Sequence, residues 1–388
     1  MSARNPMKDQ VAIVSAATTG FSPHNTARSR LSYVAEASIA ALQAAGLSAA
    51  DVDGICGTDP DAATVQATLG IPAVTWFSNP FMPLVNNFAA ACSAVAAGLC
   101  DTVLVYHSPY RLPWNTASSL KDPFRRPAAL GSPPPPESLF GAVGYTAWAA
   151  RYLHEYGATK EPFGLIAIND RTNAAQNPAA AMREPITMDD YNAARMIRWP
   201  LCLLDMDVPV DGGDAFVVTT TERARDLPLP PVLVQCAVTG MRSTNQEDQS
   251  VSLRDHGQHV TVAAMKEKSD FWIEDCDVYF PYDGFTPITL SWFENAGWCG
   301  PGEATAFLRQ HWDAASHRIL IDGRIPVNPH GGALSEGGTQ GSGHIREAVH
   351  QLQGLAGERQ VPGAARAIIT AGGFFFNAQG MVLHNGDR

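Results

Sequence analysis

The sequence predicts an α/β protein in which helices cover the sheets of two similar halves. Three observations lead to this prediction. Strand-like and helical patterns alternate along the chain, the alternation restarts in the second half, and a low charged fraction of 17% accompanies 33 glycines in 388 residues. Such alternation is typical of parallel sheets covered by helices. We therefore expect an interior-rich enzyme.

The chain opens with a strand, a helix and a second strand. Residues 11–15 (VAIVS) form a β-rich run, and residues 31–45 have the Ala-rich character of a helix. Gly46 ends this helix, because glycine readily adopts the left-handed conformation of a helix C-cap. Residues 51–56 lead into the second strand.

The middle of the chain is expected to be less regular. A small-residue helix over 89–99 and a buried strand over 101–106 precede a loop at 107–140. A helix over 145–156 follows, and then a polar stretch reaches to about residue 200. Residues 211–220 combine a glycine turn with a strand.

The strand and helix pattern restarts after a junction at 222–232. The second half has strands at 232–238 and 275–280, and a helix at 286–296 that Gly297 ends. The repeated order favours an internal duplication of a βαβ unit.

We therefore divide the chain into two halves. The N-terminal half spans residues 1–230 and includes a loop region at about 107–205, and the C-terminal half spans residues 231–388. The phrase at 45–47 (AGL) resembles that at 296–298 (AGW), although glycine after a helix is common.

Composition excludes several classes of protein. With 27 Lys and Arg against 38 Asp and Glu, the net charge is −11, which disfavours a duplex-binding protein, so we expect no nucleic-acid partner. No apolar stretch reaches the about 18 residues that a membrane span needs. The seven cysteines are scattered and form no C-x-x-C, and no secretion signal opens the chain. Reduced thiols in a cytoplasmic protein are expected.

A glycine-rich stretch at 326–349 is the most unusual part of the sequence. Six glycines lie within residues 331–343, directly before a helical pattern. Glycines allow close backbone approach, and the first N–H groups of a helix face an anion. The stretch suits a thioester or phosphate site, yet it matches neither a P-loop nor the dinucleotide fingerprint. A tight loop joining a strand to a helix is the alternative.

His330 and His344 lie within this stretch, and an imidazole can move a proton near neutral pH. A structural role for each remains the alternative. Neither has a second ligand at metal-binding spacing, so no metal site is expected. A carboxylate cluster, Asp205, Asp207, Asp211 and Asp214, lacks the pattern of a calcium loop, and we favour capping and turn roles for it.

Tyr282 and Asp283 form the second candidate stretch. They follow a predicted strand and precede a helix, the position at which α/β folds place functional side chains. A phenol has an ordinary pKa near about 10 and can donate or accept a proton if its surroundings are suitable. The alternative is a core aromatic whose hydroxyl is satisfied.

With these stretches identified, the chain resembles the thiolase superfamily, in its sterol-carrier-type branch. The resemblance covers nearly the whole chain, and its most specific parts are 211–215 (DGGDA), 282–285 (YDGF), 328–332 (NPHGG) and Ser335-Glu336. It implies two similar α/β halves in five layers, αβαβα, a homodimer, and an active site between the halves.

The resemblance also shows that the thiolase catalytic groups are missing. The nucleophilic Cys of thiolases falls near Phe81, their His on Gly338, and their second Cys near Gly372. A covalent acyl-enzyme mechanism cannot proceed without its nucleophile. Thiolysis through Cys92 or Cys299 is a third and minor hypothesis.

One branch of the superfamily, the steroid side-chain aldolases, has lost these groups. Resemblance to that branch implies retro-aldol cleavage of a β-hydroxyacyl-CoA thioester with a bulky apolar group, and a small OB-fold acyl-CoA-binding partner in a heterotetramer. It implies a catalytic role for Tyr282. The chain departs from the branch at Gly338, where the aldolases have a second catalytic tyrosine.

The expected mechanism assigns Tyr282 to the proton of the substrate hydroxyl and His330 or His344 to the other proton transfer. Backbone N–H groups of glycines are expected to stabilise the enolate. The expected substrate-binding residues are Asp283, Asn328, Gly331, Gly332, Ser335, Glu336 and Gly338. We expect no cofactor apart from the CoA of the substrate. The alternative function is a non-catalytic subunit that binds acyl-CoA or lipid.

Overall fold

The computed structural model describes residues 5–24, 26–80, 85–112, 142–242, 252–374 and 377–386. Most of the loop expected at 107–140, and Phe81, lie outside the described residues.

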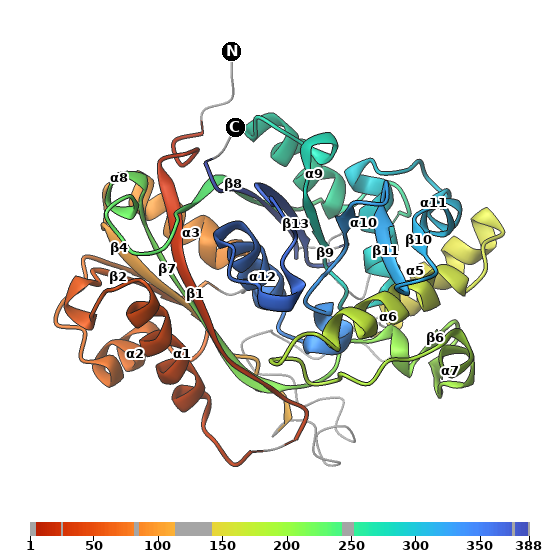
Figure 1. Cartoon of the computed structure of the whole chain (residues 1–388), viewed down its shortest axis with the longest axis horizontal. Helices are drawn as coiled ribbons and strands as arrows, with labels where there is room; N and C mark the ends of the chain where they lie inside the picture. Colours follow the sequence, from red (N-terminus) through yellow and green to blue (C-terminus); the bar gives the residue numbers. More distant parts are fainter. Residues whose placement is uncertain are drawn as a thin grey trace.

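A nine-stranded sheet joins both halves of the chain (Figure 1). Its strands, in spatial order, are β3 (Trp76–Ser78), β2 (Gly54–Gly57), β4 (Thr102–His107), β7 (Asp211–Thr220), β1 (Val11–Ser22), β8 (Val232–Gly240), β14 (Ala378–His384), β13 (Arg366–Ala371) and β9 (Val278–Pro281). The halves meet where β1 pairs with β8 through Ala12 with Leu233 and Ile13 with Val232.

The sheet is mixed, so the expectation of purely parallel pairing is wrong. Among the described strands of this sheet, only β2 with β3, β2 with β4, and β13 with β9 are parallel, whereas β7 runs antiparallel to both β4 and β1. Parallel neighbours are usually joined by a crossover that contains one helix. Instead, the residues between β4 and β7 include several helices, and this long connection brings β7 back in the opposite direction.

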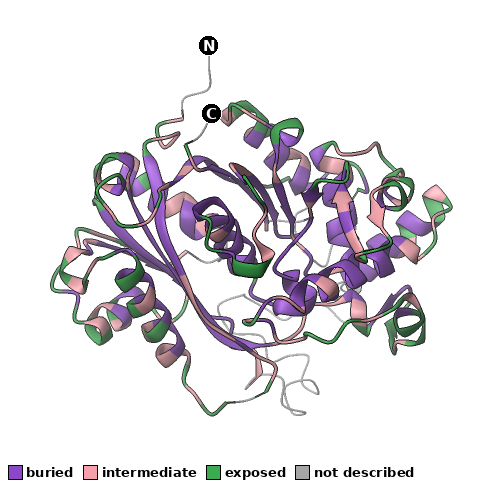
Figure 2. Cartoon of the chain, in the orientation of Figure 1, coloured by how far each residue is buried: buried purple, intermediate pink, exposed green. Residues whose placement is uncertain are grey.

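Helices cover the outer face of the strands of each half, and two further helices lie between the two halves. The order helix, strand, helix, strand, helix confirms the predicted five layers. On one outer face lie α1 (Arg30–Ala44) and α2 (Ala62–Leu69), and on the other lie α9 (Gly257–Lys268) and α10 (Thr286–Ala296). Between the halves lie α3 (Val85–Ala96) and α12 (Ser342–Gln353), which pack on strands of both. Figures 1 and 2 show α12 at the centre of the molecule, largely buried.

The predicted helix ends at Gly46 and Gly297 are confirmed. Both glycines have positive φ, 69° and 98°, directly beyond α1 and α10. The helix expected at 89–99 begins earlier, and the one at 145–156 lies within α5 (Ala142–Tyr156).

The polar stretch expected to reach residue 200 is instead partly helical. It contains the buried α6 (Glu161–Ala174), the short α7 (Met188–Ala193) and β5 (Met196–Arg198). The polar side chains of α6 are buried because they satisfy backbone groups. Asn173 Nδ2, for example, donates to the carbonyls of Val327 and Asn328 at 2.9 and 3.1 Å.

The remaining elements are short and pack around this framework. They are β6 (Leu201–Cys202), α8 (Thr221–Ala224), α11 (Ala304–Gln310), β10 (Trp312–Asp313), β11 (Arg318–Ile321), β12 (Ile325–Pro326) and the π-helix at Gly332–Glu336. No helix within the described ranges is long and apolar enough to cross a membrane.

The expected capping role is confirmed for one member of the carboxylate cluster. Asp205 accepts hydrogen bonds from the Cys202 N–H at 2.7 Å, the Tyr191 hydroxyl at 2.8 Å and the Thr286 hydroxyl at 2.7 Å. The carboxylate therefore ties the start of α10 to the turn after β6.

Candidate active site

The candidate site begins where β9 ends and α10 begins. The Tyr282 N–H continues the pairing with β13 by donating to the Thr370 carbonyl at 2.7 Å, and the half-buried phenol ring lies against His344. The two ring centroids are 5.7 Å apart. The sheet edge and the start of α12 thus bring together two side chains that are 62 positions apart in the sequence.

Asp283 connects three segments of the site. Its carboxylate accepts the N–H groups of Ala333 and Leu334 at 2.7 and 2.8 Å, and it lies 2.9 Å from His344 Nε2. Burial acts to raise the pKa of Asp283, but the hydrogen bond and charge of His344 hold it below its ordinary value. The ionised carboxylate therefore accepts the proton on His344 Nε2. His344 Nδ1 has no hydrogen-bond partner among the described residues.

A second carboxyl, Asp170 of α6, interacts with Asp283. Burial and the negative charge of Asp283 raise the pKa of Asp170 well above its ordinary value. The Asp170 carboxyl is held by Asn169 Nδ2 at 2.9 Å. Because two buried carboxyls this close cannot both ionise, Asp170 keeps its proton while Asp283 serves His344.

His330 lies beside His344 and is completely buried. The two imidazoles meet edge to face, with centroids 4.6 Å apart. Burial lowers the pKa of His330 well below its ordinary value, so the ring is neutral at pH 7. Neither ring nitrogen has a hydrogen-bond partner within the described part of the chain. An orphaned buried imidazole of this kind is a functional-site candidate.

Glu336 also lies close to His330. Its Oε2 lies 4.0 Å from His330 Nε2 and has no hydrogen-bond partner among the residues that the structure describes. Burial raises the pKa of Glu336 to about 7, against the opposing effect of Arg346. A carboxyl that titrates near neutral pH beside a neutral imidazole can take up or supply a proton.

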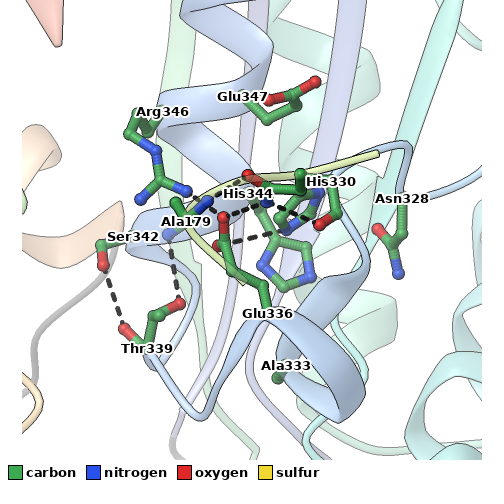
Figure 3. A network of polar contacts seen from close by, with 12 residues as sticks. Ala179, Asn328, His330, Ala333, Glu336, Thr339, Ser342, His344, Arg346 and Glu347 are labelled. Atoms are coloured by element: carbon green, nitrogen blue, oxygen red, sulfur yellow. Dashed lines mark hydrogen bonds and ion pairs between the residues drawn. The ribbon is translucent and has the colours of Figure 1, made fainter. Parts of the chain in front are cut away.

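A buried guanidinium organises the other side of Glu336. Arg346 of α12 bonds to Glu336 and to Asp214 of β7, and Asn177 Nδ2 donates to Glu336 Oε1 at 2.7 Å. Figure 3 shows Glu336 between Arg346 and the two histidines, below the first turn of α12. The network joins β7 of the first half to α12, the helix that carries His344.

Gly331 and Gly332 have the backbone freedom that the sequence indicated. Both have positive φ, 101° and 59°, and a Cβ on Gly332 would overlap the Asp283 carboxylate. Two of the glycine N–H groups that were expected to stabilise the enolate are nevertheless already used in backbone hydrogen bonds. Gly331 donates to the Asn328 carbonyl at 2.9 Å, and Gly338 donates to the Val208 carbonyl at 2.7 Å. Neither N–H is therefore offered to a thioester oxygen.

The other two expected binding residues are held by structural hydrogen bonds. Ser335 accepts a bond from Arg171 Nε at 3.1 Å, and Asn328 Nδ2 donates to the Pro281 carbonyl at 2.9 Å. Asn328 Oδ1 has no partner within the described residues. Asn328 thus orients a free acceptor close to the end of β9, whereas Ser335 tethers the π-helix to α6.

Comparison with known proteins supplies the family. A 17-hydroxy-3-oxo-4-pregnene-20-carboxyl-CoA lyase of Mycobacterium tuberculosis is 34% identical over 94% of this chain and 97% of its own length. A steroid side-chain-cleaving aldolase of Thermomonospora curvata is also 34% identical, over 96% of this chain and 97% of its own. Residues 242–385 match the family described as "Thiolase C-terminal domain-like". The chain belongs to the thiolase superfamily, among its steroid side-chain-cleaving aldolases.

Solved structures agree with this membership. A structure titled "Ltp2-ChsH2(DUF35) aldolase" matches with a TM-score of 0.84 and 32% identity, covering 97% of this chain and 98% of that one. A thiolase-like protein of Mycobacterium smegmatis matches with a TM-score of 0.70 at 16% identity, covering 99% of this chain and 79% of that one, and this shows the fold alone. The chain is thus a carbon–carbon lyase of thiolase fold. The alternative of a non-catalytic subunit gains no support from relatives that are named as lyases and aldolases.

Although the chain belongs to this superfamily, neither Cys92 nor Cys299, the two cysteines considered for thiolysis, is suited to that reaction. All seven cysteines are free thiols. Cys92 is fully buried in α3, and burial raises the pKa of its thiol to about 12. Burial likewise raises the pKa of Cys299. A nucleophilic cysteine needs a lowered pKa, so neither thiol is suited to the thiolase mechanism.

The departure at Gly338 has a structural explanation. The Arg111–Asp207 ion pair lies against Gly338, and a Cβ there would come within 2.5 Å of Asp207 Oδ2 and closer still to Arg111 Nη1. A larger side chain at position 338 cannot be accommodated unless this pair moves.

Sequence reasoning missed four of the charged groups. Asp170, Arg346 and Arg111 were not singled out, and Asp214 was assigned a turn role although it pairs with Arg346. The first two are charged residues on the buried α6 and α12, and only the structure shows that burial. Arg111 also had no signal, since it lies in a loop far from its partners in sequence.

Proposed function

We propose that the chain catalyses retro-aldol cleavage of a β-hydroxyacyl-CoA thioester that carries a steroid or other bulky apolar group. The observation that carries this proposal is the arrangement of Tyr282, His344 and Asp283, which supplies acid and base groups in a site with no usable thiol. The names of the relatives support the same chemistry.

In the proposed reaction, Tyr282 accepts the proton of the β-hydroxyl. The carbonyl forms as the bond between Cα and Cβ breaks, and the electron pair moves into the thioester enolate. His344, held by Asp283, returns a proton to Cα. The proton gained by Tyr282 then returns to His344, directly or through His330 and Glu336, so that each group ends the turnover in its starting state. The products are a ketone or aldehyde and a shorter acyl-CoA.

No cofactor enters this balance apart from the CoA carried by the substrate, because no electrons are gained or lost overall. For substrate binding we retain Asp283, Asn328, Gly332 and Glu336. Asn328 Oδ1 and Glu336 Oε2 are buried polar atoms without a partner among the described residues. Buried polar groups are expected to find partners, and a bound substrate would provide them.

We also propose a homodimer that assembles with a small OB-fold partner into a heterotetramer. The solved structure that pairs Ltp2 with a DUF35 protein supports a partner of this kind. The exposed edge strand β3 supports self-association, since Phe77 there is 63% exposed. Seven free thiols support a reducing, cytoplasmic location.

The test is to incubate the purified chain, alone and with a DUF35 partner, with a steroid β-hydroxyacyl-CoA. We expect release of a shorter acyl-CoA and an equal amount of carbonyl compound, measured by mass spectrometry, without added free CoA. The matching thioester without its β-hydroxyl should remain intact. Cleavage that depends on free CoA, or tight binding of the β-hydroxyacyl-CoA without cleavage, would contradict the proposal.

A further inference from the structure

A pocket of about 220 Å³ lies at the end of α6, and none of the candidate catalytic residues lines it. Three arginines from three separate segments line this pocket. Arg318 belongs to β11, Arg324 lies in the turn before β12, and Arg359 ends the short helix at Gly357–Arg359. A concave surface lined by cations attracts anions unless nearby carboxylates neutralise it.

Arg318 has a neutral partner instead of a carboxylate. Its Nη2 donates to Gln176 Oε1 at 2.8 Å. The attraction of Asp313 is outweighed by burial, which leaves the pKa of Arg318 below its ordinary value. Arg318 Nε is buried and has no hydrogen-bond partner among the residues that the structure describes. Since buried N–H groups normally have an acceptor, an acceptor from outside the chain would complete this site.

Arg324 is only partly offset by a carboxylate. Its Nη1 donates to the Cys276 carbonyl at 3.2 Å and lies 4.0 Å from Asp277 Oδ1. The other oxygen of Asp277 already accepts the N–H groups of Ala365 and Arg366, both at 2.9 Å. The Arg324 side chain is 53% exposed, so it is free to turn toward an anion in the pocket.

Arg359 is fully paired and holds the pocket together. Its Nε and Nη2 donate to the two carboxylate oxygens of Glu347 at 3.0 and 2.9 Å, and its Nη1 donates to the Gln176 carbonyl at 3.2 Å. Gln176 thus binds Arg359 through its backbone and Arg318 through its side chain. One residue therefore fixes two walls of the pocket.

The remaining charge of the lining is positive. Glu358 is the single acid among the described lining residues, and it is exposed, so water and salt screen its charge. Glu347 neutralises Arg359. The charges of Arg318 and Arg324 remain, and together they exceed that of Glu358.

A phosphate group suits this lining best. Guanidinium groups donate in a planar fork that matches both phosphate and carboxylate oxygens. One such fork already occupies both oxygens of a carboxylate, whereas a tetrahedral phosphate offers further oxygens to a second arginine from another direction. The pocket also has room for a phosphate group together with several waters.

We propose that this pocket binds a phosphate group, with Arg318 as its fixed donor and Arg324 turning in to complete the site. The phosphate is either free or carried by CoA as its 3′-phosphate. Pro329 lines the pocket and directly precedes His330, so the site lies next to the segment of the candidate active site without belonging to it. The proposal goes beyond the proposed function, because phosphate binding is measured without turnover.

The test is isothermal titration calorimetry of the full chain with inorganic phosphate, at low salt and near neutral pH. We expect Arg318→Gln to weaken phosphate binding at least about 10-fold, because hydrogen bonds to charged groups are strong. Arg324→Gln should also weaken binding, and its exposed position preserves the fold. Glu358→Gln should strengthen binding, because an opposing charge is removed.

Arg309→Gln is the matched control. Arg309 is 54% exposed, lies outside the pocket and pairs with Glu161, so its replacement should leave phosphate binding at the wild-type value. A wild-type chain that binds no phosphate overturns the proposal. Unchanged phosphate binding in folded Arg318→Gln and Arg324→Gln variants overturns it as well.

CoA and 3′-dephospho-CoA distinguish the two sources of the phosphate. If the pocket takes the phosphate of CoA, Arg318→Gln weakens the binding of CoA but not that of 3′-dephospho-CoA. If the phosphate is free, both compounds keep their wild-type affinity in this variant, although inorganic phosphate no longer binds. Absence of cleavage by the wild-type chain would instead count against the proposed function alone.

Discussion

In the proposed mechanism, Tyr282 is the residue that takes the proton of the β-hydroxyl, because its ring is the one phenol that lies against His344 of the His344–Asp283 pair within the described residues. His344 is oriented by a carboxylate that stays ionised, while Asp170 retains the proton that the two carboxyls cannot both release. Groups with such divergent environments are the usual basis of assigned acid and base roles. Two predictions belong to this scale.

Replacement of Tyr282 by Phe should lower kcat by at least about 10²-fold, since that is the lower end of the usual contribution of an acid–base group. The fold should be retained, because Phe fills the same space. Steady-state kinetics and a circular dichroism spectrum measure the two effects. Turnover near the wild-type rate would remove Tyr282 from the mechanism.

Glu336 should make stability depend on pH. Its pKa is raised from 4.5 to about 7, so the folded protein binds this proton more tightly than the unfolded chain, and stability is lost as pH rises through this window. Glu336→Gln lacks this loss. The free energy of unfolding of the variant minus that of wild type should therefore be larger by about 2 kcal/mol at about pH 8 than at about pH 5.

Urea unfolding at the two pH values measures this difference. His330 titrates in the opposite sense, but it is present in both proteins and its contribution largely cancels. Glu358→Gln, at an exposed glutamate, should show the pH dependence of wild type. If Glu336→Gln also keeps that dependence, the assignment of the raised pKa to Glu336 is wrong.

At the scale of elements, the π-helix at Gly332–Glu336 and the start of α12 act as one unit. The glycines before α12 let Asp283 approach the first N–H groups of the π-helix, and the same carboxylate then orients His344. Small changes in this backbone should therefore affect both stability and catalysis.

Gly332→Ala tests this coupling. The residue has φ of 59°, and its new Cβ would overlap the Asp283 carboxylate. We expect a loss of about 1–3 kcal/mol in the free energy of unfolding from the strained backbone, and a fall in kcat because Asp283 is displaced. Gly354→Ala is the matched control, with φ of 74° at the end of α12 and open space around its Cβ. Because Gly354→Ala has the same backbone strain without the overlap, it should lose stability but keep its kcat, and a Gly332→Ala variant with full activity would disprove the coupling.

At the scale of the whole molecule, the nine-stranded sheet ends in an edge strand that is exposed and apolar. β3 pairs only with β2 among the described strands, and its Phe77 is 63% exposed. Exposed edges of this kind invite pairing with another chain. The proposed homodimer would cover this edge.

We expect Phe77→Lys to convert the dimer to a monomer, because a buried lysine charge at the interface is unfavourable. Leu355→Lys, at a residue that is 49% exposed beyond α12, should leave the dimer intact. Light scattering coupled to size-exclusion chromatography measures the mass. A monomeric wild type, or a Phe77→Lys variant that remains dimeric, would contradict the proposed interface.

Much of the fold could be predicted, because strand and helix patterns and their glycine ends are local properties of the chain. Gly46 and Gly297 end helices as expected. The polar stretch that contains α6 was predicted to be part of a loop region, and this is wrong. Polar segments are normally exposed, but α6 is buried, and its Asn173 donates hydrogen bonds to the backbone carbonyls at 327–328.

The sequence by itself determined that Tyr282, Asp283, His330 and His344 form the candidate site, because each flanks a strand end or a glycine-rich turn that a local pattern reveals. Only the tertiary structure decided how these groups are charged. Asp170 interacts with Asp283 from α6, and Arg346 joins Glu336 to Asp214. The physical reason is that pKa values and ion pairs depend on burial and on distances between segments, and no local pattern specifies either of these.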